Sequence, residues 1–128
     1  MKVCGRGCPH RKCGEKGEAR RPGGGQCGDL LSTGYWAANI GEIRAGDTVA
    51  VIGAGPTGLC TMLCARLFSP ARIVAVDTDA YRLKLAREQG LADVTFMPGQ
   101  DDAAAQIRAM TEGRGADVVF EVAGGRDT

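Results

Sequence analysis

The chain has 128 residues and a formal net charge of +1, which suffices for one domain with a hydrophobic core but not for two full domains. Hydrophobic residues make up 44% and charged residues 24%, both ordinary for a soluble globular protein. No apolar run is long enough to cross a bilayer, and the charged N-terminus lacks the apolar stretch of a signal peptide. We therefore expect a cytoplasmic protein without a membrane segment.

Residues 1–28 differ in composition from the rest of the chain. They hold seven Lys or Arg against two Glu and almost no large apolar side chains, whereas residues 29–128 hold nine basic and thirteen acidic residues. A segment with so little to bury does not gain enough from folding to offset the entropy lost on ordering. We therefore predict that residues 1–28 are disordered or loosely tethered.

Four cysteines and the single histidine of the chain also lie in this basic segment: Cys4, Cys8, His10, Cys13 and Cys27. They supply enough soft ligands for a tetrahedral zinc, but their spacing matches no standard zinc finger. A disordered extension is the preferred interpretation, and a metal site is the alternative. A nucleic-acid-binding module built on the same segment is a further alternative, although interleaved aromatic residues are missing from it.

From residue 29 onward, the pattern alternates between helices and strands. Helices are predicted at 30–43, 56–68, 79–89 and 101–112, with Asp79 and Asp101 as the N-caps of the last two, and strands at 48–52, 72–76, 93–97 and 116–122. The strands are continuously apolar, which is typical of parallel strands buried on both faces and joined by crossover helices. The prediction is an α/β fold of the partial Rossmann type, with a parallel sheet of about four strands in the order 3-2-1-4.

The predicted fourth strand ends close to the end of the sequence. No further helix or strand follows it, so its apolar residues would lie at an exposed sheet edge, which favours aggregation. We therefore expect the chain to be part of a longer protein, truncated at both ends.

A glycine-rich motif, Gly53-Ala54-Gly55-Pro56-Thr57-Gly58, follows the first predicted strand and begins a helix. It matches G-x-G-x-x-G, in which Gly53 allows a tight turn, Gly55 lets a pyrophosphate approach the backbone, and Gly58 lets the helix pack against the strand. The helix N-terminus would offer N–H groups and a positive dipole end to the phosphates. The alternative is that these glycines only shape a turn.

An acidic residue, Asp77, lies 19 positions after the last glycine of this motif, at the end of the second predicted strand. At that place a carboxylate accepts hydrogen bonds from the adenosine ribose hydroxyls and repels a 2′-phosphate, which favours NAD over NADP. A strand-end aspartate without a ligand is one alternative. A methyltransferase that binds S-adenosylmethionine also combines a glycine-rich turn with such an acid, and is another.

The sequence resembles the nucleotide-binding domain of the zinc-type, medium-chain alcohol dehydrogenase family over about residues 29–124. The blocks that carry the resemblance are Ser32-Thr33-Gly34-Tyr35-Trp36-Ala37-Ala38, Arg44-Ala45-Gly46-Asp47-Thr48-Val49, Val51-Ile52 with the glycine motif and Leu59, and Gly115-Ala116-Asp117-Val118-Val119-Phe120-Glu121-Val122-Ala123-Gly124. The resemblance implies an NAD-binding domain over residues 47–125, which is incomplete, preceded by a connecting helix and turn over 29–46 and followed by a tail at 126–128.

The resemblance also implies roles for residues other than the three glycines. Within the glycine motif, Thr57 is implied to bind the cofactor. Arg82 matches a basic residue beside the adenosine ribose, and Val122 and Thr33 match positions near the nicotinamide. Asp29 matches a ligand of the catalytic zinc in a formaldehyde-dehydrogenase-like branch of the family, although it could instead cap the helix predicted at 30–43.

In the intact parent protein, the resemblance implies hydride transfer between a small alcohol or aldehyde and NAD, with zinc as a second cofactor and a homo-oligomer as one possible assembly. The family's substrate domain, with its other zinc ligands, does not precede Asp29 in this sequence. One carboxylate cannot form a catalytic zinc site, which needs three protein ligands. We therefore assign no catalytic residue to this chain and expect it to be inactive by itself.

Overall fold

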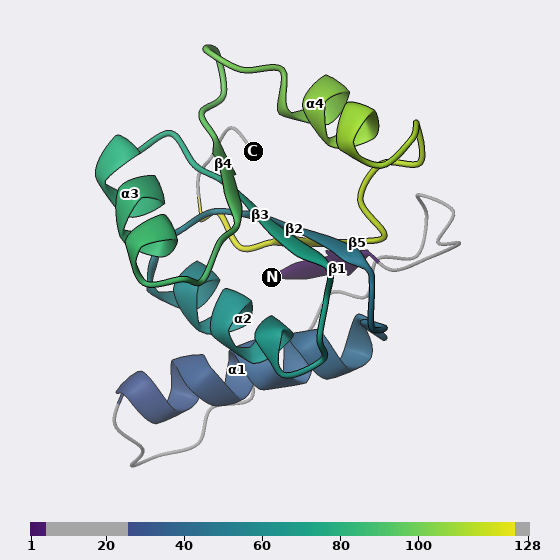
Figure 1. Ribbon diagram of the computed structural model, residues 1–128. Helices are drawn as coiled ribbons and strands as arrows, with labels where there is room; N and C mark the ends of the chain where they lie inside the picture. The colour runs from purple at the N-terminus through teal and green to yellow at the C-terminus, as the bar shows by residue number, and fades with distance from the viewer. Residues whose placement is uncertain (5–25, 125–128) are drawn as a thin grey trace.

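The parallel strands predicted from the sequence form the centre of one sheet. The computed structural model describes residues 1–4 and 26–124. Its strands are β1 (Lys2–Cys4), β2 (Thr48–Ile52), β3 (Arg72–Val76), β4 (Val94–Phe96) and β5 (Val118–Glu121), and its helices are α1 (Gln26–Ile40), α2 (Pro56–Arg66), α3 (Ala80–Glu88) and α4 (Ala103–Met110). The sheet order is β1-β5-β2-β3-β4, and β2, β3, β4 and β5 are mutually parallel. The α/β class and the order of these four strands are confirmed (Figure 1).

The expected exposed edge beside the last parallel strand is wrong, because a fifth strand covers it. β1 pairs antiparallel with β5, in the register Lys2↔Glu121, Val3↔Phe120 and Cys4↔Val119. The prediction of disorder is therefore also wrong for residues 2–4, whose backbone groups gain ladder partners on β5. Residues 5–25, with Cys8, His10 and Cys13, lie outside the described part of the chain.

The first helix begins earlier than predicted. α1 starts at Gln26 and ends at Ile40, so Asp29 lies in its first turn and does not cap it. The last helix is capped one residue later than predicted, by Asp102 in place of Asp101: the Asp102 side chain accepts a hydrogen bond from the Ala105 N–H at 3.0 Å. Asp79 caps α3 as predicted, accepting hydrogen bonds from the backbone N–H groups of Tyr81 and Arg82.

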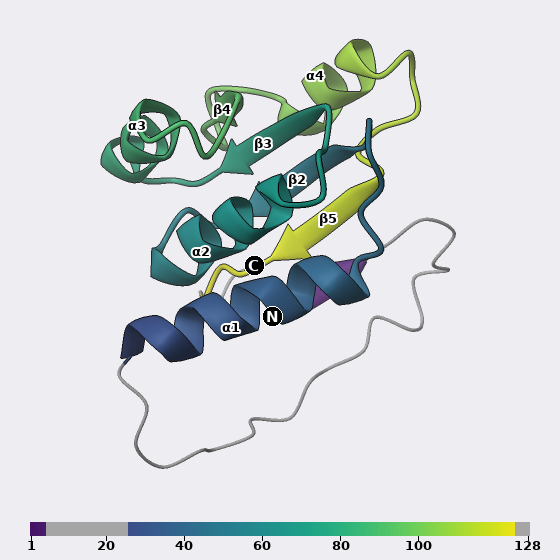
Figure 2. The same cartoon turned by 60° about the horizontal axis from the view of Figure 1, so that its bottom comes forward.

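The sheet is covered on both faces, as the continuously apolar strands require. Val49, Ile73 and Phe120 face one core with α1, α2 and α3, and Val74 and Phe96 face a second core with α4. Figure 2 shows α1 lying beside α2. Their approach is close: a Cβ on Gly34 would lie 2.9 Å from the backbone of Cys60. In the described residues no helix is long and apolar enough to span a bilayer.

The Asp93 carboxylate joins α2, β3 and the segment that leads into β4. It accepts a hydrogen bond from Arg66 Nη2 at 2.8 Å and another from the Ile73 N–H at 2.7 Å. Burial by itself would raise the pKa of Asp93, but these two hydrogen bonds and the charges of Arg66 and Arg72 outweigh it, so the pKa lies below that of an ordinary aspartate side chain. Ionised Asp93 therefore stabilises the fold above the unfolded-state pKa.

We expect Asp93→Asn to lower the free energy of unfolding at pH 7 by about 1 kcal/mol, because the side chain is partly exposed and solvent weakens the ion pair. Since the folded-state pKa is depressed, this stabilisation is lost as the pH falls through it. The difference between variant and parent should therefore vanish in acid. Urea unfolding at pH 7 and at a series of lower pH values measures this difference. A difference that stays constant as the pH falls would contradict the role of ionised Asp93 in stabilising the fold.

Gly58 sets how closely α2 packs against the end of β2. A Cβ at this position would overlap the carbonyl oxygen of Gly53, which is backbone and cannot move aside without distorting the turn. We expect Gly58→Ala to lower the free energy of unfolding by about 2 kcal/mol or more. Gly28→Ala is the matched control, because no atom lies within 4 Å of a Cβ there, and should leave stability unchanged or slightly higher. Equal stability of both variants in thermal unfolding would contradict this packing argument.

Candidate functional site

A pocket of about 510 Å³ lies where the carboxyl ends of β2, β3 and β5 meet the start of α2. Ligands of open α/β sheets bind at this edge, because the loops that follow parallel strands converge there. The pocket is lined by Ile52, Gly53, Gly55, Pro56, Thr57, Val76, Asp77, Thr78, Arg82, Pro98, Val122, Ala123 and Gly124.

The turn between β2 and α2 brings three strand ends together. Gly53 has φ +104°, a conformation that favours glycine, and its N–H donates to the Val76 carbonyl at 2.7 Å. A Cβ on Gly53 would lie 2.9 Å from the Ala123 nitrogen, so the chain after β5 passes directly over the turn. The Val122 N–H in turn donates to the Ile52 carbonyl at 2.9 Å.

Gly55 differs from the other two glycines of the motif. It is the N-cap of α2, with φ −70° and no side-chain hydrogen bond to the helix. A Cβ there would meet only Arg82 Nη1, at 3.9 Å, so the fold itself does not require glycine at this position. Because Gly55 has no side chain, the first turn of α2 is open to the pocket. The N–H groups of this turn have no acceptors within the helix.

The Asp77 carboxylate connects this turn to the next one. Its side chain is 8% exposed; Oδ2 accepts from the Ala54 N–H at 2.6 Å and Oδ1 from the Asp79 N–H at 2.8 Å. A carboxylate has about four lone-pair sites, so these two bonds leave room for further donors from the pocket. Asp77 thus has a structural role that the sequence alone does not indicate.

Arg82 covers the outer side of this carboxylate. Its guanidinium lies 3.6 Å from Asp79 and 4.0 Å from Asp77, and its side chain is half exposed. The positive charge therefore lies at the β3 end of the pocket, where Arg82 both lines the pocket and is exposed to solvent.

The structure brings most of the predicted cofactor residues together. Gly53, Gly55, Thr57, Asp77, Arg82 and Val122 line the pocket, and Gly58 lies beneath the turn. Thr33 and Asp29, by contrast, are exposed on α1 and do not line the pocket. Thr78 and Pro98 also line the pocket and were not predicted. Each follows a strand, Thr78 after β3 and Pro98 after β4, and this position at the carboxyl end of a parallel strand could have indicated them.

A zinc site does not fit the described part of the chain. Within residues 1–4 and 28–124, whose side chains the structure describes, no three His, Cys, Asp or Glu side chains lie close enough together to hold a metal ion. Asp29 therefore has no co-ligand among these residues. The alternative zinc site of the basic segment involves Cys8, His10 and Cys13, which lie outside the described residues, as does the side chain of Cys27.

Comparison with known proteins agrees with this architecture. An alcohol dehydrogenase of Cupriavidus necator is 41% identical over 102 residues, which is 80% of this chain but 28% of the relative. A zinc-type alcohol dehydrogenase B of Aspergillus flavus is 38% identical over 102 residues. Among solved structures, an alcohol dehydrogenase from Thermus sp. ATN1 superposes with a TM-score of 0.70 at 37% identity, covering 79% of this chain and 29% of that one.

The chain thus spans about a quarter of the length of these relatives, between 24% and 29%. The family model described as zinc-binding dehydrogenase matches residues 56–128, more than half of the sequence. This range begins at the first residue of α2 and includes Asp77, Arg82 and the end of β5. The formaldehyde-dehydrogenase-like branch is not specified by these matches. The chain belongs to the zinc-binding dehydrogenase family.

Proposed function

We propose that the chain binds NAD at the pocket beside β2, β3 and β5, as the cofactor-binding part of a zinc-type alcohol dehydrogenase. The observation that carries this proposal is Gly55, which is glycine although its conformation and surroundings would admit a Cβ. A ligand that must approach the backbone closely explains that residue, and the start of α2 suits the two phosphates of a dinucleotide.

The other lining residues support a position for each part of NAD in the pocket: the adenosine, the pyrophosphate and the nicotinamide. Asp77 would accept hydrogen bonds from the adenosine ribose hydroxyls, with Arg82 beside them. Gly53, Gly55 and Thr57 would hold the pyrophosphate against the start of α2. Val122, beyond the glycine turn, would lie toward the nicotinamide.

Bound NAD supplies a hydride acceptor for the carbinol carbon of an alcohol. This chain's residues bind and orient the cofactor for that step, and they hold it at the edge of the sheet. Thr33 near the nicotinamide and Asp29 as a zinc ligand stay predictions about a longer protein, as do its substrate, its cytoplasmic location and its oligomeric state. No observation favours a methyltransferase or a nucleic-acid-binding module.

We expect Gly55→Ala to leave thermal stability unchanged and to weaken NADH binding by about tenfold, the loss of roughly one hydrogen bond to a charged group. The added methyl group occupies the approach to α2, and its one neighbour within 4 Å among the described residues is Arg82 Nη1, at 3.9 Å, an ordinary contact with a half-exposed side chain. Calorimetric titration with NADH measures the affinity, and Gly28→Ala is the control. Unchanged NADH affinity in Gly55→Ala would overturn the assignment of the pyrophosphate.

Asp77 should make the chain prefer NADH to NADPH, because a carboxylate accepts from a ribose hydroxyl and repels a 2′-phosphate. Asp77→Ala should reduce the preference for NADH over NADPH by about tenfold or more, because the carboxylate that repels the 2′-phosphate is removed while Arg82, still paired with Asp79, keeps its positive charge there. The matched control is Asp79→Ala, which removes the same charge beside Arg82 but leaves Asp77 in place. Equal affinity of the unaltered chain for both cofactors would refute the role of Asp77.

A further inference from the structure

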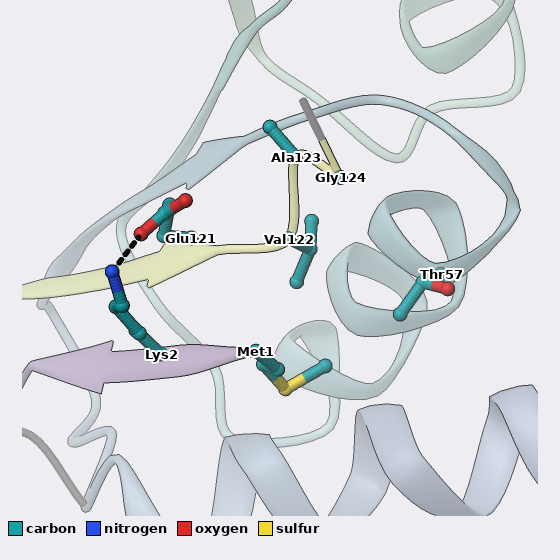
Figure 3. A pocket seen from close by; sticks show the side chains of 7 residues that line it. All are labelled: Met1, Lys2, Thr57, Glu121, Val122, Ala123 and Gly124. Carbon is teal, nitrogen blue, oxygen red and sulfur yellow. Dashed lines mark ion pairs between the residues drawn. The ribbon is translucent and has the colours of Figure 1, made fainter. Parts of the chain in front are cut away.

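A second pocket, of about 420 Å³, adjoins the first one on the side away from Asp77. The two pockets share Thr57, Val122, Ala123 and Gly124, so they form a continuous surface. The remaining lining residues of the second pocket are Met1, Lys2 and Glu121. Figure 3 shows these side chains around the end of β5.

The direction of β1 explains why Lys2 reaches this place. The parallel strands all end at the edge of the sheet that holds the pocket, and β1 runs antiparallel to β5. An antiparallel strand begins where its partner ends, so Lys2 lies opposite Glu121. The sheet order then places β3, β2, β5 and β1 in succession along the edge, with Asp77 at one end of the row and Lys2 at the other.

Lys2 and Glu121 form an ion pair of 3.5 Å at this end of the row. The Glu121 side chain is 27% exposed and that of Lys2 56%, so the carboxylate is the less solvated charge of the two. Together they offer one acceptor and one donor on the same side of the pocket. A carboxamide has the complementary set, an NH₂ group that donates and an oxygen that accepts.

We propose that Lys2 and Glu121 bind the carboxamide of the nicotinamide ring, so that the N-terminal strand contributes a specificity residue to the cofactor site. This inference rests on the proposed function, since the adenosine end must lie at Asp77 for the other end to reach β1. Glu121 accepts from the amide NH₂ and Lys2 donates to the amide oxygen. If a carboxylate replaced the amide, the negative charge of Glu121 would repel it.

Calorimetric titration of the full chain with three probes tests this assignment: NAD, ADP-ribose, and nicotinic acid adenine dinucleotide, in which a carboxylate replaces the amide. The unaltered chain should bind NAD about tenfold more tightly than the acid probe, which loses the hydrogen bond to Glu121, and should bind ADP-ribose more weakly still, because that probe loses the hydrogen bonds to both Glu121 and Lys2. Glu121→Ala should abolish the preference for the amide over the acid. Lys2→Ala should weaken NAD binding, and Lys2→Arg should restore it.

ADP-ribose, which lacks the nicotinamide, should bind every variant with the same affinity and so reports on folding and on the adenosine end. Glu88→Ala is the matched control, because it breaks a Lys84–Glu88 ion pair on α3 that lines neither pocket. If ADP-ribose binds but Glu121→Ala leaves the amide preference unchanged, the inference is wrong and the proposed function stands. If neither ADP-ribose nor NAD binds the unaltered chain, both are overturned.

Discussion

The buried Asp77 carboxylate is the interaction on which the geometry of the site depends. By accepting from the Ala54 and Asp79 N–H groups it fixes the turn after β2 relative to the turn after β3. Among the described residues, no other side chain forms a hydrogen bond between these two turns. The position of Gly55, and hence the access to α2, therefore follows from a charge at the end of the neighbouring strand. One side chain thus shapes the site and offers its remaining lone pairs to a ligand.

Two kinds of glycine meet in this turn, and the structure separates them. Gly53 and Gly58 are required by the fold, because a Cβ on either would collide with backbone. Gly55 is not, since its neighbourhood is open and its φ is ordinary. A motif of three glycines therefore combines two packing constraints with one position whose identity only a ligand explains. This distinction is stronger support for a binding site than the motif alone.

The sequence predicts well what is determined locally. The buried strands, the Asp79 cap and the glycine turn are specified by adjacent residues, and the order of the parallel strands follows from right-handed crossovers. Prediction from the sequence fails where the structure depends on contacts between residues that are distant in the chain. Lys2–Cys4 carries no strand signal, and its pairing depends on an edge more than a hundred residues away in the sequence. The early start of α1 likewise has no local signal, since the basic, glycine-rich composition before Asp29 argued against it.

The pairing of β1 also changes which groups border the site. The last parallel strand would otherwise present unpaired N–H and C=O groups, a surface that other chains can extend. A strand of three residues that carries a lysine covers that edge and is itself a poor template for further pairing. Because β1 runs in the opposite direction, it covers the edge with its first residues beside the pocket. Protection of the sheet and completion of the site's outer wall are therefore two consequences of the same antiparallel register.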